Sequence, residues 1–300
     1  MKLPDLTDLV VLRGAAHGLS LRGHRPALAQ LPGGHRSVQR GRGLEFEEVR
    51  AYTAGDDART IDWRVSARRG RLHTKLFREE RERPVWLVAD LHPGLFFGSR
   101  RQFKSALLLQ AAALLGWVAM LGGDRVGAVI SDGAAAPRIF PARTREAGVL
   151  PILEALVASQ PRAPGPTVTT GLQLALTTLR PLLQPGSLIL LLSDFSGLDA
   201  ELENILAGAA AQNDWRLLWI TDPLERSGLP AGAHRVGLPG RLWWVDGEGS
   251  RSAWQAAWGR REQRLTALAM RLSLPLVRLD TSDAVPERMI SLLKEPNWAA

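Results

Sequence analysis

Two short apolar runs, each ending in aspartate, constrain the fold of this chain more than any other feature. The runs are VWLVAD at residues 85–90 and SLILLLSD at residues 187–194. Uninterrupted runs of this length, rich in Val, Leu and Ile, are typical of strands that are buried on both faces. Longer segments with a helical pattern alternate with further apolar runs, which indicates repeated strand–helix–strand units.

The chain from residue 85 onward is therefore predicted to be an α/β fold, a doubly wound and mainly parallel sheet with helices on both faces. Further strands are predicted at residues 124–132, 136–142, 215–221 and 275–280, an edge strand at 241–246 and a short strand at 234–238. Helices are predicted at residues 101–121, 144–159, 170–182, 199–211, 251–272 and 284–293. Since ligands bind at the carboxyl ends of strands in such sheets, Asp90 and Asp194 are expected to meet at one crevice.

The first 84 residues differ from the rest. Residues 5–22 are predicted to form a helix, whereas residues 30–84 are polar, rich in Gly and Arg, and weakly periodic. This segment lacks the apolar residues for a core of its own. We therefore expect two parts: an irregular N-terminal extension, residues 1–84, which packs on an α/β domain, residues 85–300.

Composition excludes several classes of function. Cys is absent, which excludes disulfides, thiolate metal sites and a cysteine nucleophile. The phosphate-binding loop G-x-x-x-x-G-K-[ST], the dinucleotide fingerprint and the G-x-S-x-G elbow are also absent, and the six His lack zinc-site spacing. The net charge of +8 is compatible with an acidic partner. However, arginines alternate with glutamates at residues 78–83, which favours ion pairing within the chain.

Residues 30–84 contain the densest charge in the chain, and residues 41–81 are their most informative segment. Four carboxylates lie close to four arginines there: Glu45, Asp56, Asp57 and Asp62, and Arg50, Arg59, Arg64 and Arg68. Clustered carboxylates either bind two metal ions for phosphodiester hydrolysis or hold arginines in an ion network. The equal number of arginines favours the network. Trp63 is expected to dock this segment on the sheet, because it is a large apolar anchor.

This segment closely resembles the signature of domain-of-unknown-function family 58. The family pattern is matched at Gly41, Gly43, Glu45, Phe46, Arg50, Tyr52, Gly55, Asp56, Asp57, Arg59, Ile61, Asp62, Trp63, Ser66, Ala67 and Arg68. The resemblance implies a von Willebrand factor A-like domain after the signature. It also implies bacterial partners, namely a MoxR-type AAA+ ATPase and other von Willebrand A proteins.

The resemblance bears on the membrane as well, because longer family members carry two N-terminal membrane helices. The longest apolar run of this chain, residues 106–121, is shorter than the roughly 20 residues that span a bilayer. We therefore expect the short, soluble form of the family, located in the cytoplasm.

A candidate metal site also follows from the resemblance. The adhesion-site pattern Asp-x-Ser-x-Ser, then Thr, then Asp corresponds here to Asp90, Thr170 and Asp194, with His92 and Gly94 in place of the two serines. Magnesium prefers oxygen ligands, whereas Gly94 offers no side chain and His92 offers nitrogen. The expectation is a degenerate site with weak Mg²⁺ affinity. The alternative is that Asp90 and Asp194 cap helices.

The leading hypothesis for function is a non-enzymatic interaction module, an adaptor for a MoxR-type ATPase. The alternatives are a metal-dependent hydrolase that uses the signature carboxylates and a nucleic-acid binder that uses the basic N-terminal segment. Phe96 and Phe97 are the candidate partner-binding residues. They are adjacent aromatics in the loop after Asp90, and exposed aromatic anchors dominate many interfaces.

Overall fold

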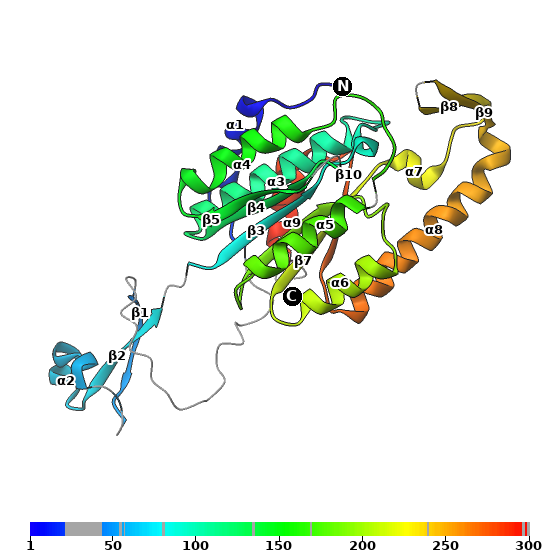
Figure 1. Ribbon diagram of the computed structural model, residues 1–300. Helices are drawn as coiled ribbons and strands as arrows, with labels where there is room; N and C mark the ends of the chain where they lie inside the picture. Colours follow the sequence, from blue (N-terminus) through cyan, green and yellow to red (C-terminus); the bar gives the residue numbers. More distant parts are fainter. Residues whose placement is uncertain are drawn as a thin grey trace. The chain divides into compact units, whose positions relative to one another are not determined.

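A computed structural model describes residues 1–21, 44–53, 56, 58–79, 82–133, 136–168, 170–238, 240–295 and 298. The chain divides into two compact units (Figure 1). Residues 1–30 and 83–300 form the first, here called the α/β body, and residues 31–82 form the second, here called the signature unit.

Within the described residues, the α/β body is built on a six-stranded sheet in the order β10-β7-β6-β3-β4-β5. The strands are β3 (Pro84–Asp90), β4 (Arg125–Ser131), β5 (Arg138–Arg143), β6 (Leu188–Ser193), β7 (Asp214–Thr221) and β10 (Leu276–Asp280). All are parallel except β5, which runs antiparallel to β4. The predicted α/β fold with a mainly parallel sheet is confirmed.

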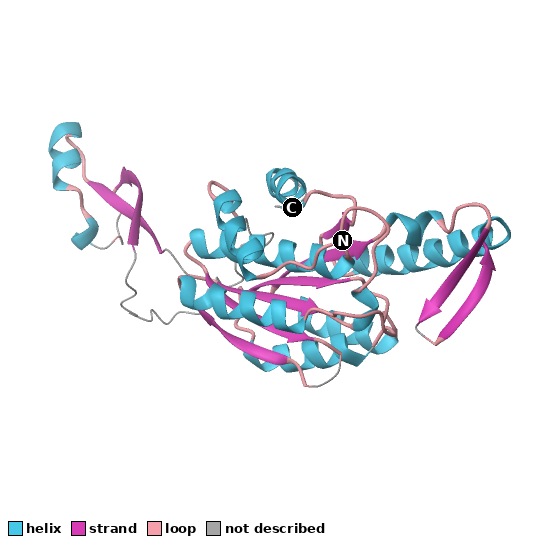
Figure 2. Cartoon of the chain, turned by 90° about the horizontal axis from the view of Figure 1, so that it is seen from above, coloured by secondary structure: helices cyan, strands magenta, loops and turns pink. Residues whose placement is uncertain are grey.

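Helices cover both faces of this sheet (Figure 2). One face packs against α3 (Lys104–Leu121), α4 (Glu146–Ser159) and α9 (Val285–Lys294), and α1 (Leu6–Ala16) packs on these helices. The other face packs against α5 (Thr170–Leu179), α6 (Ala200–Ala210) and α8 (Gly247–Arg271). Short helices η2 (Pro93–Leu95), η3 (Arg180–Leu182) and α7 (Pro223–Ser227) lie between these elements. By length and composition α3 could cross a membrane, but 83% of it is buried inside the protein.

The position of α1 differs from the expected boundary at residue 84. Leu9 and Ala16 are fully buried in the core of the α/β body, and the indole Nε1 of Trp117 donates a hydrogen bond to the Leu9 carbonyl at 3.0 Å. The apolar side of α1 therefore completes the cover of α3. Residues 1–21 belong to the α/β body and not to a separate extension.

The predicted edge strand at residues 241–246 is wrong in its placement. Strands β8 (Ala233–Leu238) and β9 (Arg241–Asp246) pair with each other as an antiparallel hairpin outside the main sheet. Gly240 has a φ of 81°, a conformation that glycine supplies readily in a tight turn. This turn folds β9 back on β8, and the hairpin lies at the N-terminal end of α8 (Figure 1).

The signature unit contains regular structure, in contrast to the irregular extension that was predicted. Strand β1 (Leu44–Ala51) pairs antiparallel with β2 (His73–Glu79), and η1 (Ala58–Thr60) and α2 (Trp63–Arg69) lie between them in the sequence. Docking of this unit on the sheet stays a prediction. Trp63 is 68% exposed, so it does not contribute to an apolar interior of the signature unit itself.

Candidate functional site at the carboxyl ends of the central strands

Asp90 and Asp194 lie at the same edge of the sheet. Asp90 is the last residue of β3 and Asp194 directly follows β6, the neighbouring strand. The chain order of the strands reverses between β3 and β6, and this switch point is where doubly wound sheets bind ligands. Both carboxylates are buried, and the Ser193 hydroxyl donates a hydrogen bond to Asp90 Oδ2 at 2.7 Å.

His92 connects the two carboxylates. Its Nδ1 accepts a hydrogen bond from the Gly94 amide at 3.1 Å, so in the neutral form of the ring the proton lies on Nε2. Nε2 faces Asp194 Oδ1 at 3.3 Å. Burial lowers the pKa of His92, but the hydrogen bond and charge of Asp194 and the charge of Asp90 outweigh it, and the pKa is raised.

Lys104 supplies a buried positive charge that the sequence analysis did not identify. It is the first residue of α3 and is 1% exposed. Its Nζ donates to Asp194 Oδ2 at 2.6 Å and to Glu225 Oε1 at 2.8 Å. Burial alone would lower the pKa of Lys104, but the charges and hydrogen bonds of these two carboxylates raise it, so Lys104 is an ammonium ion.

Arg261 of α8 adds a second cation to the same carboxylates. Its guanidinium lies 3.7 Å from Asp194 Oδ1 and 3.8 Å from Glu225 Oε1. Burial raises the pKa of Asp194, yet Lys104, His92 and Arg261 together hold it well below the usual value. We call these six residues the Lys104 cluster: Asp90, His92, Lys104, Asp194, Glu225 and Arg261.

Asp90 is the exception within the Lys104 cluster. Among the described residues, its Oδ1 is buried and has no hydrogen-bond partner. Burial raises the pKa of Asp90 to about 6, although the charge of His92 and the hydrogen bond from Ser193 oppose the shift. Asp194 is therefore fully neutralised by cations, whereas Asp90 is not.

Thr170 does not share the buried environment of Asp90 and Asp194, because it is exposed at the first residue of α5. The threonine beside the loop after β3 is Thr167. A Cβ added at Gly94 would lie 2.9 Å from the Thr167 hydroxyl and 2.9 Å from the His92 ring. A serine at position 94 would therefore require both the His92 ring and the Thr167 hydroxyl to move.

The residues at this edge do not fit a divalent cation. Magnesium requires about six oxygen ligands near 2.1 Å. Asp194 already accepts hydrogen bonds from Lys104 on Oδ2 and from the Ser196 amide on Oδ1, and His92 faces Oδ1 as well. In the part of the chain that the structure describes, no group of three His, Asp or Glu side chains is arranged to hold a metal.

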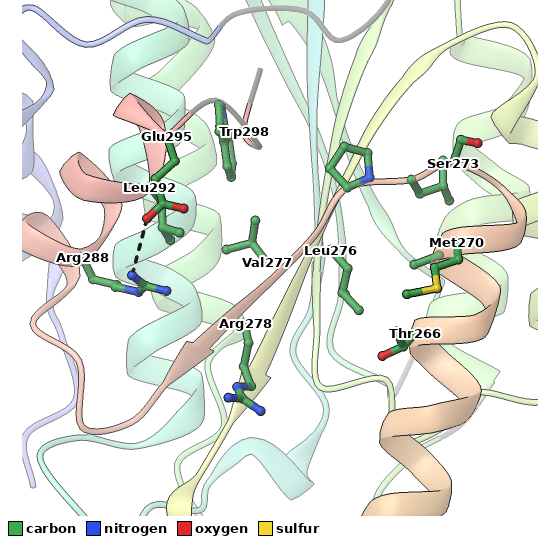
Figure 3. Close-up of a pocket in the computed structure, with 13 residues that line it drawn as sticks. Thr266, Met270, Ser273, Leu276, Val277, Arg278, Arg288, Leu292, Glu295 and Trp298 are labelled. Carbon is green, nitrogen blue, oxygen red and sulfur yellow. Dashed lines mark ion pairs between the residues drawn. The ribbon is translucent and has the colours of Figure 1, made fainter. Parts of the chain in front are cut away.

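Two pockets are lined in part by residues of α8. One of about 310 Å³ is lined by Glu225, Trp254, Ala257, Trp258 and Arg261, so it reaches the part-exposed side of the Lys104 cluster. The other, of about 610 Å³, lies at the outer edge of β10 between α8 and α9, where Arg288 and Glu295 form an ion pair at 4.0 Å (Figure 3). The second pocket contains no residue of the Lys104 cluster.

Phe96 and Phe97 are half-buried rather than exposed. The Phe96 ring stacks on Phe103, with centroids 4.4 Å apart. The loop that carries both is anchored, because the amide and hydroxyl of Ser99 donate to the buried carboxylate of Asp222. These contacts leave little aromatic surface for a partner at this loop.

Exposed aromatic residues lie instead on the β8–β9 hairpin, here called the Trp hairpin, residues 233–246. Trp243 is 51% exposed and Trp244 is 72% exposed. The guanidinium of Arg241 lies 5.1 Å from the Trp243 ring centroid, and that of Arg235 lies 5.9 Å from the Trp244 centroid. The sequence signal for this surface is the Trp-Trp pair beside arginines, although the strand pattern by itself predicts an edge strand there.

In the signature unit, the structure brings Arg50, Tyr52 and Asp56 together. The Arg50 guanidinium donates two hydrogen bonds to Asp56, at 2.9 and 2.7 Å, and the Tyr52 hydroxyl donates to the Asp56 carbonyl at 3.1 Å. The hydrogen bonds from Arg50 and from the Thr53 amide lower the pKa of Asp56. This bidentate pair fits the ion-network interpretation of the carboxylates.

The other signature residues have separate positions. Asp62 is the N-cap of α2 and accepts from the amides of Arg64 and Val65 at 3.0 and 3.1 Å. Arg59 and Arg68 are exposed. The side chain of Glu45 and all of Asp57 lie outside the described residues.

A comparison with protein families shows which family this chain belongs to. A family model described as "Protein of unknown function DUF58" matches residues 48–245. The chain belongs to this family. The match begins within the signature unit and ends in the Trp hairpin, so DUF58 similarity covers the Lys104 cluster up to Glu225.

Relatives of this DUF58 chain include the uncharacterized proteins Rv1480 of Mycobacterium tuberculosis and Mb1516 of Mycobacterium bovis. Each is 34% identical over 195 residues, which are 65% of this chain and 60% of the relative. The chain thus spans about 60% of the length of these relatives.

Solved structures with some similarity include conserved hypothetical protein BatB from Bacteroides thetaiotaomicron, with 13% identity and a TM-score of 0.41. An aerotolerance-related membrane protein from Bacteroides fragilis has 12% identity and the same TM-score. In both cases the similarity covers 70% of this chain and 98% of the other.

Proposed function

We propose that this DUF58 chain is a non-enzymatic interaction module with a von Willebrand A-like domain, which acts as an adaptor for a MoxR-type AAA+ ATPase in the cytoplasm. The observation that carries the proposal is the Lys104 cluster. Asp194, at the switch point, is neutralised by Lys104 and Arg261 and is 3% exposed. A site filled by the protein's own cations is suited to holding a binding surface in shape, not to activating a substrate.

The signature unit supports the same conclusion. A metal-dependent hydrolase needs carboxylates that are free to hold metal ions. Asp56 instead accepts two hydrogen bonds from Arg50, and Asp62 caps α2. Both carboxylates are used to fix local structure, which leaves the hydrolase alternative without support from the described contacts.

The Trp hairpin is the surface that we propose for the partner. Trp and Arg are the residue types that contribute most binding energy at protein interfaces. Residues 233–246 include two arginines and one histidine against one carboxylate, that of Asp246, which accepts hydrogen bonds from the amides of Glu248 and Gly249 as the N-cap of α8. The positive charge of the surface therefore fits an acidic face of the partner. This replaces Phe96 and Phe97 as the partner-binding residues, because both are half-buried and the Phe96 ring stacks on Phe103.

The test is co-purification of the full chain with the MoxR-type ATPase of the same host. The double variant Trp243→Ala with Trp244→Ala should lose the ATPase while its unfolding free energy stays within about 1 kcal/mol of the wild type, as for surface substitutions. Met270→Ala, which removes an equally exposed apolar side chain from α8, is the matched control and should bind normally. Normal binding by the double variant would exclude the Trp hairpin as the docking surface, and failure of the wild type to bind would exclude the adaptor function.

A further inference from the structure

The ammonium group of Lys104 lies between two carboxylates that would otherwise need another positive ion. Asp194 follows β6 and Glu225 lies in α7, and each places one carboxylate oxygen within 2.8 Å of Nζ. Lys104 itself begins α3, so one ammonium group joins three separate elements at the switch point. Two carboxylates that converge on one buried point require a positive charge between them.

We infer that the Lys104 ammonium substitutes permanently for a divalent cation at the switch point, so that this site does not take up Mg²⁺ or Mn²⁺. The inference concerns only the α/β body and does not depend on the adaptor function. It implies that any partner bound at this edge of the sheet binds without a metal bridge.

The charges of the cluster support this inference. Lys104 and Arg261 provide two positive charges against the carboxylates of Asp194 and Glu225. A divalent ion on Asp194 would lie beside the ammonium group in a site shielded from water, where like charges repel strongly. The ammonium has no route to solvent that keeps these contacts, because its side chain is only 2% exposed.

His92 and Gly94 also make the site unsuitable for a divalent cation. The His92 ring and the Thr167 hydroxyl occupy the space into which a Cβ at position 94 would project. A serine at position 94 therefore requires a smaller residue in place of His92 and a shift of the Thr167 hydroxyl. Three positions, 92, 94 and 104, thus act together to convert a site for a divalent ion into one that holds a fixed ammonium group.

The experiment compares three full-length proteins by thermal melting in EDTA and in millimolar MgCl₂ or MnCl₂. These are the wild type, the variant with His92→Ser and Gly94→Ser, and the same variant with Lys104→Ala added. Metal should leave the melting temperature of the wild type unchanged, and it should also leave that of the double variant unchanged. The triple variant should gain several degrees with metal, because metal that binds only the folded state stabilises it.

Two controls make the result specific. Lys294→Ala, added to the double variant in place of Lys104→Ala, removes an exposed lysine and should give no metal response. Asp194→Asn, added to the triple variant, should abolish the response.

The inference is overturned if the wild type or the double variant gains a metal-dependent rise that Asp194→Asn removes. It is also overturned if the triple variant shows no response. If the triple variant is unfolded in EDTA, recovery of a cooperative melt in MnCl₂ supports the inference, and continued absence of a melt in MnCl₂ overturns it.

Discussion

The Lys104 cluster and the Arg50–Asp56 pair both contain hydrogen-bonded ion pairs, but they differ in solvent exposure. Lys104 and Asp194 have side chains 2% and 4% exposed, whereas Arg50 and Asp56 are 38% and 19% exposed. Removing one partner of a buried pair leaves an uncompensated charge in a medium that solvates it poorly. Near the surface, water and salt replace the lost partner. Similar distances in the two regions therefore correspond to different energies.

The largest expected effect comes from breaking the buried pair. Lys104→Met should cost about 3–5 kcal/mol of unfolding free energy, because Asp194 and Glu225 lose their shared ammonium group. Urea unfolding of the full chain at neutral pH measures this. Lys294→Met, at an exposed position of α9, should stay within about 0.5 kcal/mol of the wild type. A loss below about 1 kcal/mol for Lys104→Met would mean that burial does not distinguish the two regions.

The second largest effect is expected from the opposite pKa shifts of Asp90 and Asp194 within the Lys104 cluster. The pKa of Asp90 is raised from 3.8 to about 6, so the folded state retains a proton that the unfolded chain has released. Stability from this group is present below pH 4 and is lost as pH rises toward 6. Asp90→Asn does not titrate, so its unfolding free energy relative to the wild type should rise by about 2–3 kcal/mol between pH 4 and pH 7. Urea melts across this range test it, and a pH-independent difference would contradict the assigned shift.

The smallest effect is expected at the signature pair. Asp56→Ala removes the acceptor of Arg50 and of the Thr53 amide. Since the pKa of Asp56 is lowered, its contribution is present above about pH 4 and lost as pH falls further. Hydrogen exchange should show faster exchange of the Thr53 amide, with less difference from the wild type in high salt. A fall in global stability as large as that of Lys104→Met would refute the comparison.

The main features of the sheet could be predicted from the sequence because its strands are short and apolar throughout. Val85–Asp90 and Leu188–Ser193 are apolar on both faces, so they are buried only as inner strands of a sheet covered by helices on both sides. The two strands are parallel neighbours, which brings Asp90 and Asp194 to the same edge of the sheet. The hairpin at residues 233–246 was placed wrongly, because a strand pattern does not show which strand it pairs with. The α1 boundary was missed because the helix packs on α3, about a hundred residues later in the chain.

Lys104 illustrates why the candidate site was only half predicted. Its partners, Asp194 and Glu225, are 90 and 121 residues away in the sequence. A single lysine at the start of an apolar helix is ordinarily a solvated helix end, so local pattern gave no reason to bury it. The available signal was indirect: α3 is almost completely apolar after Lys104, which leaves no exposed face toward which its first turn could point.

Arg83 joins two segments of the α/β body that are separated in the sequence by the signature unit. Its guanidinium donates to the Leu21 carbonyl and also lies 3.5 Å from Asp124, at the start of β4. Two segments of the α/β body that lie on either side of the signature unit in the sequence are therefore hydrogen-bonded to each other, at Leu21 and Arg83. In the sequence, residues 31–82 are an insertion between two segments of the α/β body. Such an insertion can change in length or sequence without a change in the strand order of the sheet, because the hydrogen bond between Arg83 and Leu21 already joins the flanking segments.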